Sequence, residues 1–261
     1  MNLNRIVVKV GTSTLTYENG KVNLRRIEAL CKVLSDLHNQ GREIILVSSG
    51  AIGVGVGKMG LLKKPSSTKE KQALAAIGQC ELMFMYDKLF GEYNNMVAQV
   101  LLTSDAVDSA HKKDNVLNTF NTLLEMGIIP IVNENDTVAI DELEGHNFGD
   151  NDMLSAIVAK LVAADGLVIL TDIDGLYNAD PRKNPDAKRI ERVENITQEI
   201  EQMAGGSGSN RGTGGMTTKI KAAKYVNESG IDCFVIAGDN PARIYDITDG
   251  KSVGTLFCGK K

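Results

Sequence analysis

The residues best suited to bind phosphate lie in a glycine-rich segment, Gly212-Thr213-Gly214-Gly215, which leads directly into a helical pattern. Glycine lets the backbone approach a ligand closely, and the first N–H groups of a helix combine a free donor with a partial positive charge. Lys219, one turn into that pattern, adds a full charge. The segment therefore predicts a phosphate site. It is not a Walker A loop, because no G-x-x-x-x-G-K-[ST] string occurs in the chain, and no H-R-D or D-F-G set indicates a protein kinase.

A second lysine, Lys9, lies inside the apolar run at residues 6–10 and is followed at once by Gly11. A charge in a buried strand is costly unless it meets a negative partner, so Lys9 with its neighbouring glycine favours contact with phosphate. The alternative is an edge strand whose lysine points to solvent. Gly50 lies in a small-residue turn after the next strand, where backbone amides could face the same anion, although such turns are common.

Polar side chains follow two more predicted strands. Residues 133–136 (Asn-Glu-Asn-Asp) come directly after one strand, and residues 149–152 (Gly-Asp-Asn-Asp) stand just before an apolar helix. These side chains suit recognition of a small polar molecule, but the first string could be a polar turn and an acid of the second a helix cap. Thr171 and Asp172 follow the second of these strands, where a carboxylate could bind ribose hydroxyls, help hold a metal, or form an Asx turn.

Residues 55–60 read literally as G-x-G-x-x-G. The dinucleotide-binding fingerprint requires its glycines immediately after a strand, whereas this string begins about eight residues beyond one. We therefore do not expect a dinucleotide site there.

Short apolar runs alternate with helical periods along the whole chain. The pattern predicts strands at residues 6–10, 44–47, 96–102, 128–132, 167–170 and 233–236. It predicts helices between a cap at Asn23 and Gly41, and at about 69–90, 115–126 and 153–163, with one more after the glycine-rich segment. In the helix at 69–90 we expect Ile77, Met83 and Phe84 to lie in the core. This alternation indicates an α/β fold with a largely parallel sheet covered on both faces, in which ligands lie beyond the carboxyl ends of the strands.

Composition narrows the function classes. The chain has 261 residues, a net charge of −4, 5% aromatic residues and no tryptophan, so nucleic acid is not an expected partner. No apolar run approaches the roughly 20 residues that span a membrane. The four cysteines form no C-x-x-C pair, which argues against zinc and favours small buried side chains in a reducing cytoplasm.

Taken together, six strings resemble the glutamate 5-kinases, within the amino-acid kinase superfamily. They occur in order over nearly the whole chain, at residues 8–13, 47–51, 133–136, 149–152, 170–172 and 212–219. The resemblance implies a three-layer α/β/α sandwich with a largely parallel central sheet. It also implies ATP-dependent phosphorylation of the side-chain carboxylate of L-glutamate, in that family the first step toward proline. Many members carry a C-terminal PUA domain; here we expect residues 1–261 to form a single amino-acid kinase domain without one.

The resemblance implies that Lys9 and Lys219 contact the transferring phosphoryl group and that Asp152 orients the two lysines. The expected ATP site comprises Lys9, Gly11, Gly50, Thr171, Asp172, Thr213, Gly214, Gly215, Met216, Thr217, Thr218 and Lys219. Mg²⁺ is expected as a bridge between phosphates, with no protein ligand identified.

We expect glutamate to lie among Ser49, Asp136 and Asn151, with Asn133 nearby. Asp136 suits the α-ammonium, while Asn and Ser side chains suit the α-carboxylate as donors. The reacting carboxylate has a reference pKa of about 4.3, so it is already ionised at neutral pH and needs no general base. This agrees with the absence of histidine from all six strings.

The expected partners are ATP and L-glutamate, a second copy of the chain in a homo-oligomer, and a reductase that receives glutamyl phosphate; proline is a candidate feedback inhibitor. Two other functions remain open. One is a related kinase acting on aspartate, N-acetylglutamate, carbamate or a nucleoside monophosphate. The other is a non-catalytic sensor of amino acids or nucleotides. Such a protein could lose a lysine that contacts the phosphoryl group, so the presence of both Lys9 and Lys219 favours catalysis.

Overall fold

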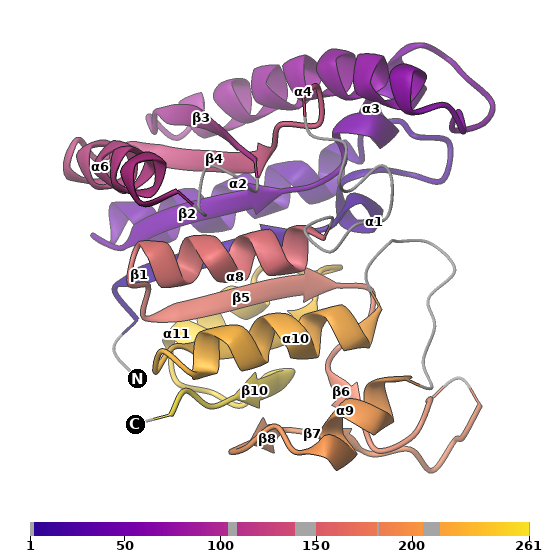
Figure 1. Cartoon of the computed structure of the whole chain (residues 1–261), viewed down its shortest axis with the longest axis vertical. Helices are drawn as coiled ribbons and strands as arrows, with labels where there is room; N and C mark the ends of the chain where they lie inside the picture. Colours follow the sequence, from indigo (N-terminus) through magenta and orange to yellow (C-terminus); the bar gives the residue numbers. More distant parts are fainter. Residues whose placement is uncertain (1–2, 104–108, 139–149, 182, 206–214, 261) are drawn as a thin grey trace.

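A mostly parallel sheet forms the centre of the computed structural model, which describes residues 3–103, 109–138, 150–181, 183–205 and 215–260 (Figure 1). Within these residues the strand order is β3-β4-β2-β1-β5-β9-β10-β8. The first six of these strands run parallel, and β10 is antiparallel to β9. The strands in this order are β3 (Val97–Leu102), β4 (Ile129–Glu134), β2 (Glu43–Ser48), β1 (Arg5–Val10), β5 (Gly166–Thr171), β9 (Asp232–Ala237), β10 (Thr255–Phe257) and β8 (Arg192–Val193). A separate hairpin pairs β6 (Leu176–Tyr177) with β7 (Arg189–Ile190).

Helices cover both faces of the sheet, which confirms the predicted layered α/β fold. The helices on one face are α2 (Leu24–Asn39), α3 (Ala51–Lys58), α4 (Thr68–Gly91) and α11 (Arg243–Thr248). Those on the other are α6 (Ala110–Glu125), α8 (Asn151–Leu161), α9 (Gln198–Gly205) and α10 (Met216–Asn227), and a short α1 (Thr12–Leu15) follows β1. Among the described residues, no helix combines the length and apolar character needed to cross a membrane.

The strand residues alternate between these two layers, as the period of a strand requires. In β1, Val7 packs in the core beneath α8 and α10, whereas Ile6, Val8 and Val10 pack in the core beneath α2 and α4. Lys9 therefore shares the face of Val7 and points toward α8 and α10.

Two sequence predictions about helices were wrong. Phe84 was expected in the core, but 61% of it is exposed, and the buried positions of α4 are Leu74, Ala75, Gly78, Leu82, Tyr86 and Phe90. This series follows a spacing of about four residues, and Phe84 lies off it. Helix α6 also begins at Ala110, five residues before the predicted Asn115, because its first turn is polar and exposed and carries no apolar periodicity.

One glycine of the G-x-G-x-x-G string, Gly55, lies where α3 packs against α4, opposite Gly78 of α4. A β-carbon on Gly55 would lie 2.1 Å from the carbonyl oxygen of Leu74, and one on Gly78 would lie 1.7 Å from that of Ala51. Both distances are impossible for real atoms, so α3 and α4 approach each other as closely as they do only because both positions lack a side chain.

Replacing Gly78 with alanine should therefore destabilise the fold by about 1–3 kcal/mol, because the new methyl group forces α3 and α4 apart. The measurement is urea unfolding of the two proteins. Gly91→Ala is the matched control: it lies at the end of the same helix, with nothing within 4 Å of the added carbon, and should leave stability unchanged or slightly higher. Equal unfolding midpoints for both variants would contradict close packing at Gly78.

Three of the four cysteines are buried as expected, Cys31, Cys233 and Cys258, but Cys80 on α4 is exposed. Burial raises the pKa of the Cys31 and Cys233 thiols well above the ordinary value, so both remain protonated and behave as small apolar side chains.

Candidate active site

The central position of β1 explains why Lys9 is buried. The strand is paired on one side with β2 and on the other with β5, and Lys9 stands opposite Val47 and Ile169 in these two strands. Lys9 is only 6% exposed. The alternative of a solvent-facing lysine on an edge strand is therefore wrong.

The N-terminus of α8 separates the roles of two neighbouring acids. Asp150 is the cap of the helix, and its side chain accepts a hydrogen bond of 2.9 Å from the backbone nitrogen of Asp152. The helix-cap alternative thus holds for Asp150. Asn151 and Asp152 form the first helical turn and are both buried, and α8 packs across β1 where Lys9 lies.

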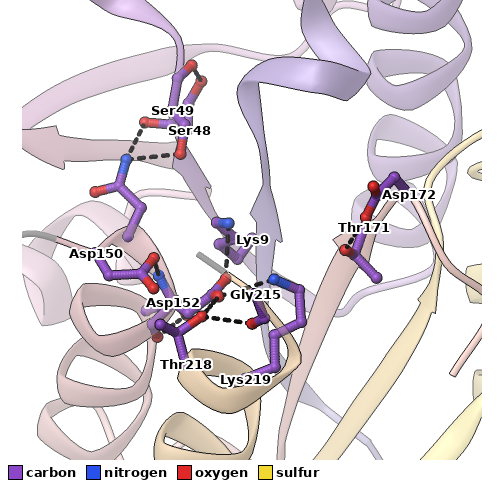
Figure 2. A network of polar contacts seen from close by, with 12 residues as sticks. Lys9, Ser48, Ser49, Asp150, Asp152, Thr171, Asp172, Gly215, Thr218 and Lys219 are labelled. Carbon is purple, nitrogen blue, oxygen red and sulfur yellow. Dashed lines mark hydrogen bonds and ion pairs between the residues drawn. The ribbon is translucent and has the colours of Figure 1, made fainter. Parts of the chain in front are cut away.

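Asp152 bridges the two lysines that the sequence singled out. Its Oδ1 lies 2.7 Å from the ammonium nitrogen of Lys9, and its Oδ2 accepts a hydrogen bond of 3.0 Å from that of Lys219 (Figure 2). The hydroxyl of Thr218 lies 2.8 Å from the same Oδ2 and 2.8 Å from the carbonyl oxygen of Gly215. Three elements far apart in sequence, β1, α8 and α10, therefore meet at one carboxylate that is completely inaccessible to solvent.

The charges of this cluster keep the carboxylate ionised. Burial alone would raise the pKa of Asp152, but the ammonium groups of Lys9 and Lys219 outweigh burial and lower that pKa to about 2. The three side chains together carry two positive charges and one negative. Such an arrangement in a buried place suits an anion with several oxygens.

A second cluster, built from amide side chains, lies beside the first. The side-chain nitrogen of Asn151 lies 2.8 Å from Ser49 Oγ, 3.0 Å from Asn133 Oδ1 and 3.3 Å from the carbonyl oxygen of Ser48. Three of the four residues expected around glutamate, Ser49, Asn133 and Asn151, are therefore in contact. The fourth, Asp136, is buried two residues beyond the end of β4.

Gly11, Gly50, Thr171 and Asp172, four of the residues expected to contact ATP, lie at or just beyond the carboxyl ends of β1, β2 and β5. Gly11 is beside Lys9, since a β-carbon on it would lie 3.6 Å from the lysine nitrogen, and Gly50 caps α3 with a φ of 102° that favours glycine. Thr171 ends β5 and donates a hydrogen bond of 3.1 Å to Asp172, which is exposed.

The beginning of α10 supplies the remaining described residues of the expected ATP site. Gly215 is its cap residue, Met216 is buried, and Thr217 is exposed. The other expected residues of this segment, Thr213 and Gly214, lie outside the described residues.

Carboxylates in the described part of the chain do not assemble into a metal site. No group of three or more His, Cys, Asp or Glu side chains is placed there to hold an ion.

Two polar residues of α4 contact the site and were missed from the sequence. Gln79 accepts a hydrogen bond of 3.0 Å from the side-chain nitrogen of Asn133, and the hydroxyl of Tyr86 lies 2.8 Å from that of Ser48. Burial raises the pKa of Tyr86 well above the ordinary value, so its hydroxyl stays protonated. The two residues are seven positions apart, two helical turns, and this spacing is the one signal that could have linked them.

Comparison with known proteins shows which family the chain belongs to. Residues 4–237 match the amino acid kinase family. A glutamate 5-kinase of Clostridium perfringens is 62% identical over 258 residues, covering 98% of this chain and 96% of that protein. A glutamate 5-kinase of Listeria innocua is 57% identical over 261 residues, covering 100% of this chain and 95% of that protein.

Two solved structures share the fold of this chain at low sequence identity. A UMP kinase from Bacillus anthracis covers 100% of this chain and 98% of its own with a TM-score of 0.66 at 16% identity. An isopentenyl phosphate kinase from T. acidophilum covers 97% and 99% with a TM-score of 0.62 at 19% identity.

Proposed function

The chain belongs to the amino acid kinase family, and we propose that it is a glutamate 5-kinase, which phosphorylates the side-chain carboxylate of L-glutamate with ATP. The product is L-glutamyl 5-phosphate, formed in the first step of proline biosynthesis. The observation that supports this most directly is the bridge from Lys9 through Asp152 to Lys219, next to the amide cluster. A cationic cluster suited to a phosphoryl group and a cluster of polar side chains are thereby adjacent.

In the proposed reaction, a side-chain carboxylate oxygen of glutamate attacks the γ-phosphorus of ATP. A new P–O bond forms, the bond from that phosphorus to the β,γ-bridging oxygen breaks, and ADP leaves with the electron pair. No proton moves, because the nucleophile is already ionised at neutral pH. Catalysis then depends on positioning two anions and neutralising the charge between them.

Lys9 and Lys219 are assigned to the transferring phosphoryl group in this proposal. Asp152 has each oxygen on a different lysine, so it fixes the distance between their ammonium groups and limits their repulsion. Amides near Gly11 and Gly50 would support the phosphoryl oxygens, and Thr171, Asp172 and the start of α10 would contact the nucleotide. Mg²⁺, carried by the phosphates, supplies further charge neutralisation when it is bound.

Glutamate is assigned to the neighbouring pocket, with Ser49, Asn133, Asn151 and Asp136 around its α-carbon end. Asp136 is the candidate partner of the α-ammonium, since it is a buried carboxylate close in sequence to Asn133. This placement would direct the opposite end of glutamate toward the lysines.

Replacing Asp136 with alanine should raise the KM for glutamate by roughly 10- to 100-fold, because a hydrogen bond to a charged group is worth about 1.5–3 kcal/mol. Initial rates at varied glutamate and fixed saturating ATP measure this change, and the KM for ATP should stay constant. Thr137→Ala, at the exposed neighbouring residue, is the control. An unchanged glutamate KM in Asp136→Ala would contradict the assignment of Asp136 to the glutamate site.

We further propose how the protein assembles and where it acts. Residues 1–261 form one kinase domain in this proposal, and copies of the chain assemble into a homo-oligomer. Proline is the proposed feedback inhibitor. A cytoplasmic location follows from the need for ATP and glutamate. Glutamyl phosphate is an acyl phosphate and hydrolyses readily, so we expect a reductase that accepts it soon after release.

The deciding experiment is ATP consumption with Mg²⁺ and hydroxylamine in the presence of L-glutamate, L-aspartate, N-acetyl-L-glutamate or UMP. Hydroxylamine converts an acyl phosphate to a hydroxamate, so glutamate-dependent hydroxamate identifies both the substrate and its reacting carboxylate. N-acetyl-L-glutamate lacks the ammonium charge and should be a poor substrate. Turnover only with another acceptor would refute the proposed substrate, and ATP binding without turnover would favour a sensor.

A further inference from the structure

A chain of side-chain amides connects α4 to the proposed glutamate pocket. Asn151 contacts Asn133 at 3.0 Å through its side-chain nitrogen, and Asn133 in turn donates to the side-chain oxygen of Gln79 at 3.0 Å. Gln79 is half-buried, and Asn133 and Asn151 are 2% and 8% exposed. Hydrogen bonds therefore connect Asn133 and Asn151 to α4, which covers the face of the sheet opposite to α8.

A backbone carbonyl fixes the orientation of the three side-chain amides in this series, those of Asn151, Asn133 and Gln79. The carbonyl oxygen of Ser48 can only accept, so the nitrogen of Asn151 must face it. The oxygen of Asn133 must then face Asn151, which turns the nitrogen of Asn133 toward the oxygen of Gln79.

This orientation determines which atom of Asn151 remains for a ligand. An amide nitrogen carries two hydrogens, and Asn151 already has three protein acceptors around that nitrogen. Its Oδ1 is buried and has no hydrogen-bond partner within the described ranges. A buried oxygen without a donor is unfavourable by about 1–3 kcal/mol, and a ligand that brings a donor would offset that cost.

Only one group of L-glutamate can supply this donor. At neutral pH its two carboxylates accept hydrogen bonds, and its α-ammonium alone donates them. The geometry therefore matches the oxygen of Asn151 with the ammonium, not its nitrogen with the α-carboxylate as the sequence suggested.

We propose that Gln79 is a positioning residue for substrate specificity: by holding the side chain of Asn133 against that of Asn151, it keeps the Asn151 oxygen in place for the α-ammonium of glutamate. This inference rests on the proposed function. Helix α4 is well suited to the role, because Gly78 packs directly on Ala51 and Tyr86 contacts Ser48 two turns after Gln79. The helix therefore holds the pocket at two points.

The test compares glutamate with glutarate, which has both carboxylates but no ammonium. In Gln79→Met the KM for glutamate should rise about tenfold, equivalent to one lost hydrogen bond, with kcat within about twofold of the parent protein. The inhibition constant of glutarate against glutamate should not change. Gln79→Glu retains an acceptor for Asn133 and should keep the preference for glutamate.

Gln72→Met is the matched control, because Gln72 is also half-buried and lies two turns earlier on the same helix. It should leave both ligands unaffected. The inference is overturned if Gln79→Met leaves the glutamate KM unchanged, or if glutamate and glutarate weaken by the same factor, as a general disturbance of α4 would produce. Absence of glutamate-dependent hydroxamate from the parent protein would instead refute the proposed function.

Discussion

Replacing Lys219 with methionine is expected to lower kcat by about 10²–10³-fold while the KM for glutamate changes little. Methionine keeps the length and apolar stem of the side chain and removes its charge. Since charge builds on the phosphoryl group mainly during transfer, the lysine acts chiefly on the transition state. Steady-state rates at saturating ATP and varied glutamate measure the two constants.

Lys224→Met provides the matched control for this prediction. Lys224 lies on the same helix but is exposed, and its ion pair with Glu201 is a surface one, so its loss should have little effect. A change confined to the glutamate KM in Lys219→Met would exclude Lys219 from phosphoryl transfer.

Replacing Asp152 with asparagine should destabilise the fold by about 3–5 kcal/mol, because two buried ammonium groups lose their shared counter-charge. It should also lower kcat strongly, since the two lysines are then no longer held apart at a fixed distance. ATP affinity should change less. Urea unfolding and steady-state rates measure these effects, and Asp150→Asn is the control, because asparagine caps a helix as well as aspartate does.

The pH dependence of folding stability provides an independent test of the same carboxylate. Its pKa is about 2 in the folded protein and 3.8 when unperturbed, so ionised Asp152 stabilises the fold above about pH 4. That contribution is lost as the pH falls through the range from 3.8 to about 2. Asp152→Asn should lack this part of the pH dependence of stability, and a parallel pH profile in both proteins would contradict the assigned charge.

Much of the fold could be predicted from the sequence because its strands are short, apolar and separated by clear helical periods. All six predicted strands occur, with ends displaced by at most two residues. The prediction was weakest where local pattern carries little information: Phe84 is apolar but lies off the buried face of α4, and the first turn of α6 is polar.

For the site, the sequence indicated which residues carry charge and which strands precede them, but not how side chains share partners. That Asp152 takes one lysine on each oxygen is a property of the assembled sheet. Gln79 was not predicted, because a glutamine inside a helix is usually a solvated residue, and its partner Asn133 lies on another element.

The position of β1 between β2 and β5 also has a consequence for biosynthesis. After β2 emerges from the ribosome, everything from α3 to α8 must be synthesised before β5 can cover the other edge of β1. Until then, the central strand of the future enzyme is an open edge that can pair with another chain. Shortened products that end before β5 should therefore aggregate or bind to chaperones. Strand β1, with Lys9, is paired on both edges only after more than half of the polypeptide has been synthesised.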